Sequence, residues 1–325
     1  MINKNDSLLF IGLGGAGQRH LRILRKLLPE NKFYALRKRN SSPLLMANFE
    51  VDNSSTIEDK YKVKSFYYEN DLKGIKPKIT IISTPTITHT NYSLLAKKLG
   101  SNVFVEKPGI SSKEDIDLLE KTFGNSTLFF KVGFQRSYHP IFKKVLEEIK
   151  KDDINEKYYC TLRLSSFVPD WHPYEDFKNL YACQKNLGGG VILTECHEIN
   201  IVNKIFGKPL QIQKKLYKDE KYKLNVFDSA EFKVKYERCD MISDISFMRK
   251  PNERTINIIN KNGDIQYFMD FNKNELLIEK NNKKTKKNYE IDNDYLFELQ
   301  AKNLISLKNN NSFELESLRN LSKFI

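Results

Sequence analysis

The stretch LLFIGLGGAGQRH, residues 8–20, decides the fold of this chain. Four apolar residues, typical of a buried strand, lead straight into a glycine-rich turn that opens a helix pattern. In such a unit, Gly12 permits the tight turn, Gly14 lets a phosphate group approach the backbone, and Gly17 allows the helix to pack closely on the strand. In this context the stretch predicts a dinucleotide-binding turn rather than an ordinary strand-to-helix loop.

Two further backbone amides belong to the predicted phosphate site. Gly15 and Ala16 stand in the turn just before the expected helix, where their backbone N–H groups are expected to point at phosphate oxygens. These amides and the positive end of the helix dipole favour a pyrophosphate group. His20, later in the same stretch, is interpreted as a surface or packing residue.

The first 130 residues alternate short apolar runs with helix-length amphipathic segments. This alternation is typical of a doubly wound parallel sheet. The expected strands are residues 8–12, 32–36, 64–67, 79–83, 103–106 and 128–133, and the expected helices are 18–28, 89–99 and 113–123. We therefore predict a dinucleotide-binding Rossmann domain over residues 1–125.

After the expected helix over residues 138–150, the pattern changes to mainly strand-like runs joined by short turns, which predicts a mostly antiparallel sheet. The expected strands are residues 157–167, 211–217, 229–236, 241–248, 255–260, 264–270 and 275–279, and the expected helices are 138–150, 190–206, 293–307 and 313–324. Asn262-Gly263 predicts a two-residue hairpin turn. The fold class is therefore α/β, with a substrate-binding and oligomerisation domain over residues 126–325.

The chain carries 54 lysines and arginines against 41 acidic residues, a net charge of +13. Such an excess can serve nucleic acid, a membrane surface or an anionic metabolite, but dispersed lysine in contact with solvent is the simpler interpretation. The densest block, KNNKKTKK at residues 280–287, is predicted to be a hairpin tip. No zinc-finger spacing or RNA-binding signature accompanies it, so no nucleic-acid partner is predicted.

Cysteine spacing and hydropathy narrow the class of protein further. Cys160, Cys183, Cys196 and Cys239 form no CxxC pair, so we predict buried thiols and no metal site. No run of 18 apolar residues is present, which argues against a membrane span. The N-terminus shows no secretory cleavage pattern, and a cytoplasmic location is expected.

The residues that follow the second expected strand select the cofactor. An acidic residue there accepts a hydrogen bond from the ribose 2′-hydroxyl of NAD, whereas a positive side chain accommodates the 2′-phosphate of NADP. This chain has Arg37, Lys38 and Arg39 at that edge and no carboxylate. We therefore predict NADP over NAD, although NAD stays possible because arginine also stacks on aromatic rings.

Glu106-Lys107-Pro108 places a lysine at the carboxyl end of a parallel strand, the edge at which doubly wound sheets bind ligands. The glycine turn, STPTITH at residues 83–89, this motif and VGFQR at residues 132–136 follow one another in the chain. Together they resemble the Gfo/Idh/MocA family of oxidoreductases, the glucose–fructose oxidoreductase and inositol dehydrogenase type. The resemblance extends from residue 8 to about residue 206.

This resemblance implies a Rossmann domain followed by an α/β domain whose open sheet often forms an oligomer interface, and hence a homo-oligomer, a dimer or tetramer. It implies that Lys107 lies near the nicotinamide and the reacting carbinol. A histidine behind the glycine triplet at residues 188–190, here His197, completes the site. The residues implied to line or approach the cofactor also include Ser83, Thr84, Pro85, His89 and Gln135.

Many members carry aspartates shortly before and three residues after this histidine. This chain has Thr194 and Asn200 there, and Glu195 is the nearby carboxylate that we assign to the substrate. The acid–base partner of His197 is therefore open.

Oxidation of a secondary alcohol requires a proton acceptor while hydride leaves the carbon for the nicotinamide. Histidine titrates near neutral pH, so His197 is expected to be the acid/base group. Lys107 is expected to polarise the reacting oxygen and stabilise its developing charge. The two roles could be exchanged. Glu106 orients Lys107 or contacts the nicotinamide ribose.

The loop VPDWHPYED, residues 168–176, holds the chain's single tryptophan. An aromatic face beside polar groups suits a sugar ring, so Trp171, His172 and Tyr174 are predicted to bind substrate. A structural corner held by two prolines is the alternative. His139 either caps a helix or touches the substrate.

These observations predict an NAD(P)-dependent oxidoreductase that acts on a sugar, cyclitol or nucleotide-linked sugar. An imine or enone reductase on the same scaffold is one alternative, because a fold does not determine chemistry. A non-catalytic dinucleotide-binding regulator is the other. Formation of reduced cofactor with a sugar panel distinguishes an enzyme from a regulator.

Overall fold

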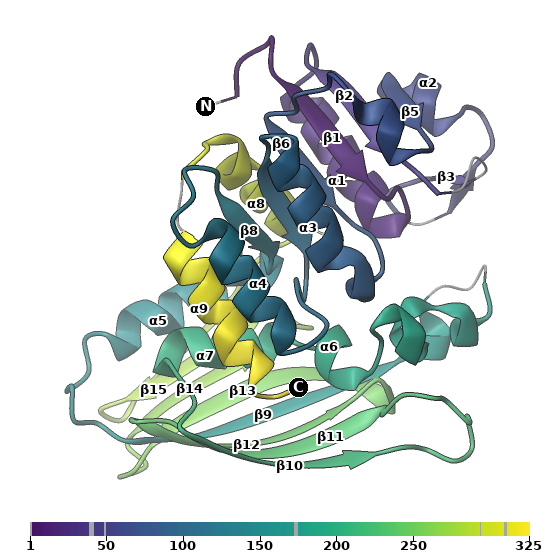
Figure 1. Cartoon of the computed structure of the whole chain (residues 1–325). Helices are drawn as coiled ribbons and strands as arrows, with labels where there is room; N and C mark the ends of the chain where they lie inside the picture. Colours follow the sequence, from purple (N-terminus) through teal and green to yellow (C-terminus); the bar gives the residue numbers. More distant parts are fainter. Residues whose placement is uncertain (1, 39–41, 49, 172–174, 293, 309–310) are drawn as a thin grey trace. The chain divides into compact units, whose positions relative to one another are not determined.

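The computed structural model describes all residues except 1, 39–41, 49, 172–174, 293 and 309–310, and the side chains of residues 312 and 313. Within the described part the chain divides into two compact units (Figure 1). The first unit comprises Met1–Gly133 and Phe297–Leu318, and the second comprises Phe134–Leu296 and Arg319–Ile325. A segment from near the end of the chain thus returns to the first unit.

The first unit is built on a parallel sheet, which six of the described strands form in the order β5-β2-β1-β6-β7-β8. This is the Rossmann order, in which successive strands are added towards one edge of the sheet up to β5 and towards the other edge from β6 onward, so that the strand order reverses between β1 and β6. Ligands of such sheets bind at the carboxyl ends of the strands beside that point. The strands are β1 (Ser7–Ile11), β2 (Lys32–Leu36), β5 (Val63–Phe66), β6 (Ile79–Ile82), β7 (Asn102–Glu106) and β8 (Phe130–Gly133).

Helices cover this sheet and join its strands, as the sequence pattern predicts. They are α1 (Gly15–Leu27), α2 (Ile57–Tyr61), α3 (His89–Lys98) and α4 (Glu114–Phe123), with the short η1 (Glu69–Leu72) and η2 (Thr86–Thr88). Two short strands, β3 (Leu44–Leu45) and β4 (Val51–Asp52), pair within the connection that follows β2. Ala301 and Leu304 of α8 (Tyr295–Ile305) are buried in the same hydrophobic core as Leu8 and Phe10 of β1.

The second unit is built on a mixed sheet, in which eight described strands follow the order β10-β11-β12-β9-β13-β14-β15-β16. Neighbours are antiparallel except β12 and β9, which run parallel. The mostly antiparallel prediction is therefore confirmed. The strands are β9 (Tyr158–Phe167), β10 (Gln211–Tyr217), β11 (Ser229–Lys235), β12 (Cys239–Ser246), β13 (Met248–Asn260), β14 (Ile265–Asp270), β15 (Glu275–Lys280) and β16 (Lys283–Asn288).

One face of the mixed sheet is covered by helices and the other is open. Figure 1 shows α5 and α7 over the covered face. The helices of this part are α5 (Pro140–Ile149), α6 (Val191–Thr194) and α7 (His197–Phe206), with short turns η3 (Gln135–Tyr138), η4 (Val168–Asp170), η5 (Phe177–Asn179), η6 (Tyr181–Cys183) and η7 (Lys185–Leu187). The chain closes with α9 (Asn311–Ser322).

Three sequence predictions need correction. The expected helix over residues 190–206 is two helices, because the backbone leaves the helical conformation at Glu195. The lysine block is not only a hairpin tip: Asn281 and Asn282 make the turn with positive φ, and residues from Lys283 onward form the edge strand β16. The Asn262-Gly263 hairpin has a loop of four residues, 261–264, rather than two.

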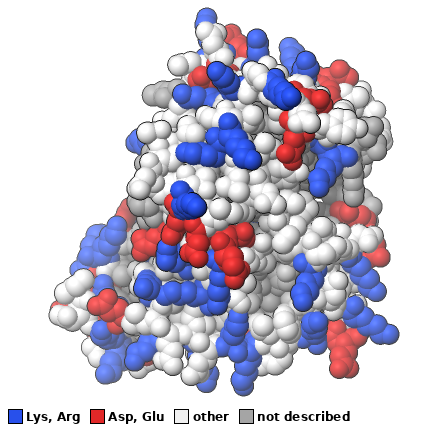
Figure 2. Space-filling model, in the orientation of Figure 1, with Lys and Arg blue, Asp and Glu red and all other residues white. Residues whose placement is uncertain are grey.

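The charges and cysteines agree with the simpler predictions. On the face drawn in Figure 2, lysine and arginine side chains are scattered among acidic and uncharged residues. All four cysteines are buried, and none of them forms a disulfide. Among the described residues, no helix combines the length and apolar character that crossing a bilayer requires.

Candidate active site

The glycine turn between β1 and α1 has three different steric environments. Gly12 has φ of +88°, a conformation that favours glycine. A methyl group at Gly17 would lie 2.2 Å from the carbonyl oxygen of Gly12, so only glycine lets the helix pack this closely. A methyl group at Gly14 would meet nothing within 4 Å, which leaves this side of the turn open. All three environments agree with the roles expected for a dinucleotide turn.

The N-terminus of α1 offers backbone amides without competition from carboxylates. Gly14 precedes the helix with an extended backbone and no side-chain cap, and Gly14 and Ala16 are exposed. The first turn, all of it described, contains no acidic residue. The amides of Gly15 and Ala16 and the helix dipole therefore remain available to an anion.

Arg37, directly after β2, is held inside the fold. Its side chain is 3% exposed, and its Nη1 donates to the carboxylate of Glu58, which also accepts a hydrogen bond of 2.6 Å from Ser65. Burial acts to raise the pKa of Glu58, but the bonds from Ser65 and Arg37 outweigh it and hold the pKa below its usual value. Glu58 therefore neutralises Arg37.

Lys38 differs from its neighbour because it is exposed. It lines a hollow of about 380 Å³ together with residues that include Thr88, Tyr92 and Lys98. Lys38 is therefore the described cation at the end of β2 that solvent, or a ligand phosphate, can reach.

Residues 83–85 follow β6 and adjoin the glycine turn. A methyl group at Gly12 would lie 2.7 Å from the carbonyl oxygen of Ser83. Pro85 stands before η2. His89 holds this loop from behind: its side chain is buried, and the ring Nε2 lies 2.8 Å from the carbonyl oxygen of Thr84, to which it donates. His89 thus fixes the loop that was expected to line the cofactor.

We expect His89 to make stability fall as the pH decreases. Burial lowers its pKa to about 4, against an ordinary value of about 6.5. Between these values the unfolded chain binds a proton that the folded chain does not, so acidification favours unfolding. We would measure the free energy of unfolding by urea titration at pH 7 and at pH 5. Between these two pH values it should decrease by about 2 kcal/mol less for His89→Gln than for the unmodified protein. Equal losses would contradict the assignment.

Glu106 and Lys107 lie at the carboxyl end of β7. Glu106 Oε1 is 2.6 Å from Nε2 of His20, and Glu106 Oε2 accepts a bond of 3.2 Å from the backbone N–H of Lys107. Burial acts to raise the pKa of Glu106, but His20 and Lys107 hold it below its usual value. Lys107 itself is half-buried. The carboxylate is therefore fixed beside Lys107.

His20 is the site residue that the sequence interpretation missed. It is buried in α1, with its ring centroid 5.0 Å from that of Phe104. It connects the glycine-turn helix to Glu106, which is 86 residues away in the chain. Its place three residues after Gly17, on the helix face that packs against the sheet, is the signal that could have indicated it.

His197 is the first residue of α7 in the second unit. Its ring meets that of Phe134 edge-on, with centroids 6.0 Å apart. Glu195 and Glu198 flank it and are both buried. Glu195 accepts bonds from Ser166, 2.8 Å, and from Arg254, 2.7 Å. The Glu195 carboxylate is therefore satisfied within the fold.

The other predicted residues of the second unit lie in two segments. Gln135 begins η3, and its Oε1 is buried without a hydrogen-bond partner among the described residues. Trp171 follows η4 and contacts Phe247, with ring centroids 6.5 Å apart. His172 and Tyr174 lie outside the described residues. His139 caps α5 by accepting from the N–H of Ile141, which confirms the capping alternative.

Comparison with known proteins agrees with this geometry. Residues 7–134 match the Gfo/Idh/MocA model, described as an oxidoreductase family with an NAD-binding Rossmann fold. The chain is 23% identical over 205 residues to myo-inositol 2-dehydrogenase of Thermotoga maritima, covering 62% of this chain and 55% of that enzyme. It is 26% identical over 149 residues to scyllo-inositol 2-dehydrogenase of Bacillus subtilis, covering 46% and 41%. The chain thus spans about half the length of the curated relatives it matches.

The fold is also similar to that of a solved structure, UDP-N-acetylglucosamine 3-dehydrogenase from Acidithiobacillus ferrooxidans. The TM-score is 0.76 at 14% identity, and the alignment covers 100% of this chain and 96% of that one. This similarity establishes the two-part α/β fold over the whole chain.

Proposed function

We propose that this protein is an NAD(P)-dependent dehydrogenase, because residues 7–134 match the model of the Gfo/Idh/MocA oxidoreductase family with its NAD-binding Rossmann fold. It transfers hydride between the nicotinamide and a secondary alcohol or ketone of a sugar, cyclitol or nucleotide-linked sugar. One observation carries the proposal: the glycine turn, residues 83–85 and Glu106-Lys107 all lie at the carboxyl ends of β1, β6 and β7. These strands are neighbours at the reversal point of the parallel sheet.

The residues at these strand ends fit a dinucleotide. The open side of Gly14 and the free first turn of α1 suit a pyrophosphate. Residues 83–85 and Gln135 would line the nicotinamide half. When bound, the cofactor supplies the hydride acceptor or donor. The protein supplies position, charge and a path for the proton.

In this proposal, Lys107 stabilises the charge on the reacting oxygen and His197 transfers the proton. The Lys107 ammonium group donates a hydrogen bond to the reacting oxygen and stabilises its negative charge as the O–H proton leaves. His197 accepts that proton during oxidation and returns it during reduction. Glu106, fixed by His20, holds Lys107 in place. Exchange of the two proton roles is the alternative that a pH–rate profile decides.

The activity test is a panel of alcohols with both oxidised cofactors. We would measure absorbance of the reduced nicotinamide with myo-inositol, scyllo-inositol and UDP-N-acetylglucosamine, the compounds that the relatives' names provide. The proposal expects turnover with at least one sugar-like alcohol, and the net charge of +13 favours an anionic, nucleotide-linked one. If the protein binds the cofactor but oxidises none of an extended set of alcohols, a regulatory role replaces the enzyme. Reduction of imines or enones alone would support the other alternative.

We further propose that the protein prefers NADP, with Lys38 as the contact to the 2′-phosphate. Arg37 is already neutralised by Glu58, whereas Lys38 is exposed beside a hollow. Lys38→Ala should therefore weaken NADPH binding about tenfold and change NADH binding little, as expected for the loss of one charge-assisted hydrogen bond. Lys32→Ala, at the exposed start of β2, is the matched control. Equal effects on both cofactors, measured by nucleotide fluorescence, would argue against this contact.

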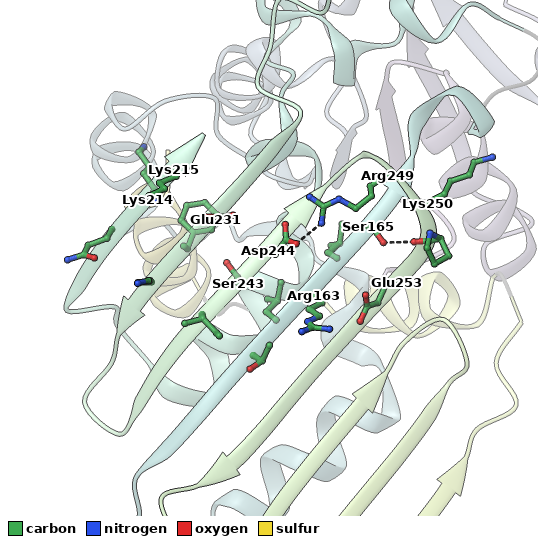
Figure 3. Close-up of a pocket in the computed structure, with 18 residues that line it drawn as sticks. Arg163, Ser165, Lys214, Lys215, Glu231, Ser243, Asp244, Arg249, Lys250 and Glu253 are labelled. Carbon is green, nitrogen blue, oxygen red and sulfur yellow. Dashed lines mark hydrogen bonds and ion pairs between the residues drawn. The ribbon is translucent and has the colours of Figure 1, made fainter. Parts of the chain in front are cut away.

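The open face of the mixed sheet is the proposed surface of a homo-oligomer. Tyr159 and Ile242 are 54% and 55% exposed on this face, where they alternate with buried residues of β9 and β12. The face also bears a hollow of about 640 Å³ in which the Arg249 side chain points at Asp244, 2.5 Å away (Figure 3). Apolar patches with a polar rim are typical of protein interfaces.

Light scattering on a sizing column tests the oligomer. We expect a dimer or tetramer for the unmodified chain and a shift towards monomer for Ile242→Arg, because a charge without a partner opposes burial. Ile154→Arg changes a residue that is 74% exposed outside the mixed sheet and serves as the control. A monomeric unmodified protein would refute this surface. A cytoplasmic location completes the proposal, and the four buried cysteines, none of which forms a disulfide, support a reducing compartment.

A further inference from the structure

We infer that Arg254 is a positioning residue that fixes the backbone carrying His197. The inference rests on the proposed role of His197 as the acid/base group. It concerns a cluster of buried charges in the second unit that the proposed chemistry does not otherwise use. The cluster consists of Arg136, Ser166, Glu195, Glu198 and Arg254, and we call it the Arg254 cluster.

The Arg254 cluster binds side chains on both sides of His197 in the sequence. Glu195 lies two residues before it, where α6 has ended and the backbone has left the helical conformation (φ −106°, ψ 40°). Glu198 lies one residue after it, in the first turn of α7. A break between two helices leaves the direction of the next residue poorly determined by backbone hydrogen bonds alone. Side-chain bonds on both flanks supply the missing constraint.

Arg254 reaches both flanking carboxylates from β13. Its Nη2 donates to Glu195 Oε2 over 2.7 Å, and its Nη1 lies 3.2 Å from each carboxylate oxygen of Glu198. Burial acts to lower the pKa of Arg254, but the two glutamates outweigh it and raise the pKa above its usual value. The planar guanidinium group is the side chain that can hold two carboxylates in a fixed geometry.

Two further contacts close the cluster. Ser166 of β9 donates to the second oxygen of Glu195 over 2.8 Å. Arg136 of η3 lies 3.2 Å from Glu198, so the segment that starts at Gln135 is bound to the same carboxylate. Two arginines thus balance two glutamates whose side chains are only 3% and 0% exposed. The segments that carry Gln135 and His197, both predicted site residues, are therefore fixed by one cluster.

Orientation rather than stability is the better explanation of this arrangement. Buried ion pairs contribute little net stability compared with apolar side chains of the same volume, because both charges lose their hydration. Forked hydrogen bonds, in contrast, determine direction. In this inference Glu195 acts through Arg254, with its oxygens engaged, rather than on the substrate.

The test replaces the planar guanidinium group of Arg254 and keeps its positive charge. Arg254→Lys preserves the balance of charges, so the chain should fold, but an ammonium group cannot reproduce the bonds to both glutamates. We expect kcat to fall at least about tenfold, because small misplacement of a reacting group is costly. The KM and the Kd for NADPH should change less than twofold. Arg238→Lys is the matched control, because Arg238 also donates through two guanidinium nitrogens, here Nε and Nη2, but to the carbonyls of Glu156 and Asp153.

A second readout follows His197 directly and needs no substrate. In protein labelled with ¹³C-histidine, the imidazole signal of His197 is identified as the one lost in His197→Asn. Arg254→Lys should move that signal and leave those of His20 and His89 in place, while Arg238→Lys moves none of them. An unchanged His197 signal together with unchanged kcat would overturn the inference. If the unmodified protein oxidises no alcohol, the proposed function fails, and the imidazole signal alone decides whether Arg254 positions His197.

Discussion

Lys107→Ala and His197→Ala should each lower kcat at least about a hundredfold and leave cofactor affinity nearly unchanged. Loss of the Lys107 ammonium group removes the donor that stabilises charge on the reacting oxygen, and loss of the His197 imidazole removes the proton acceptor. Neither change touches the glycine turn, so the phosphate contacts survive. Steady-state rates with the alcohol that the panel identifies, together with NADPH titrations, measure both effects.

Controls separate this result from a general loss of structure. Lys113→Ala removes an exposed lysine six residues further along the chain and should retain full activity. Circular dichroism and thermal unfolding of the two alanine variants should resemble those of the unmodified protein. Near-normal turnover in both variants would exclude Lys107 and His197 from the mechanism. A tenfold loss of cofactor affinity would assign them to binding instead.

Gly17→Ala and Gly14→Ala should both lose dinucleotide affinity, but only Gly17→Ala should also lose stability. The new methyl group at position 17 would lie 2.2 Å from the Gly12 carbonyl oxygen, which real contacts do not allow, so the turn must move. We expect a loss of about 1–3 kcal/mol of unfolding free energy, the usual cost of overpacking, and loss of dinucleotide binding. The helical preference of alanine, about 1 kcal/mol, does not offset this collision.

At position 14 the methyl group meets no atom within 4 Å, and the backbone φ of −73° suits alanine. Stability should therefore change by less than about 0.5 kcal/mol. The methyl group would still occupy the space that a pyrophosphate needs, so NADPH affinity should fall at least about tenfold. Urea unfolding gives the free energy of unfolding of each variant, and NADPH titration gives its dissociation constant. Unchanged affinity in Gly14→Ala would place the dinucleotide elsewhere.

Local sequence pattern predicted the elements of the parallel sheet well. β2 has the expected bounds, and the other five strands lie within two residues of theirs. This succeeds because a strand buried on both faces is almost continuously apolar, as residues Leu8–Ile11 of β1 are. The same pattern cannot show where a helix packs. Nothing in the sequence of α8 indicates that Ala301 and Leu304 join the core of the first unit.

Most of the site features that the sequence did not predict are contacts between side chains that lie far apart in the chain. Arg37 pairs with Glu58 and His20 with Glu106, and neither pair has a local signal. The edge strand β16 follows no apolar alternation, because every residue in it is exposed and backbone bonds to β15 alone define it. Lysine on an edge strand also discourages pairing with other chains. Glu195, at the break between α6 and α7, is bound by Arg254, 59 residues further on.

A crystal structure with bound NADP⁺ tests the central claim most directly. The proposal predicts that C4 of the nicotinamide, the Lys107 ammonium nitrogen and an imidazole nitrogen of His197 surround one space the size of a carbinol group. Each nitrogen should then reach the reacting oxygen within about 3 Å, directly or through one water. The contradictory result is a complex in which either nitrogen lies more than about 10 Å from C4, because no hydride path could then use it.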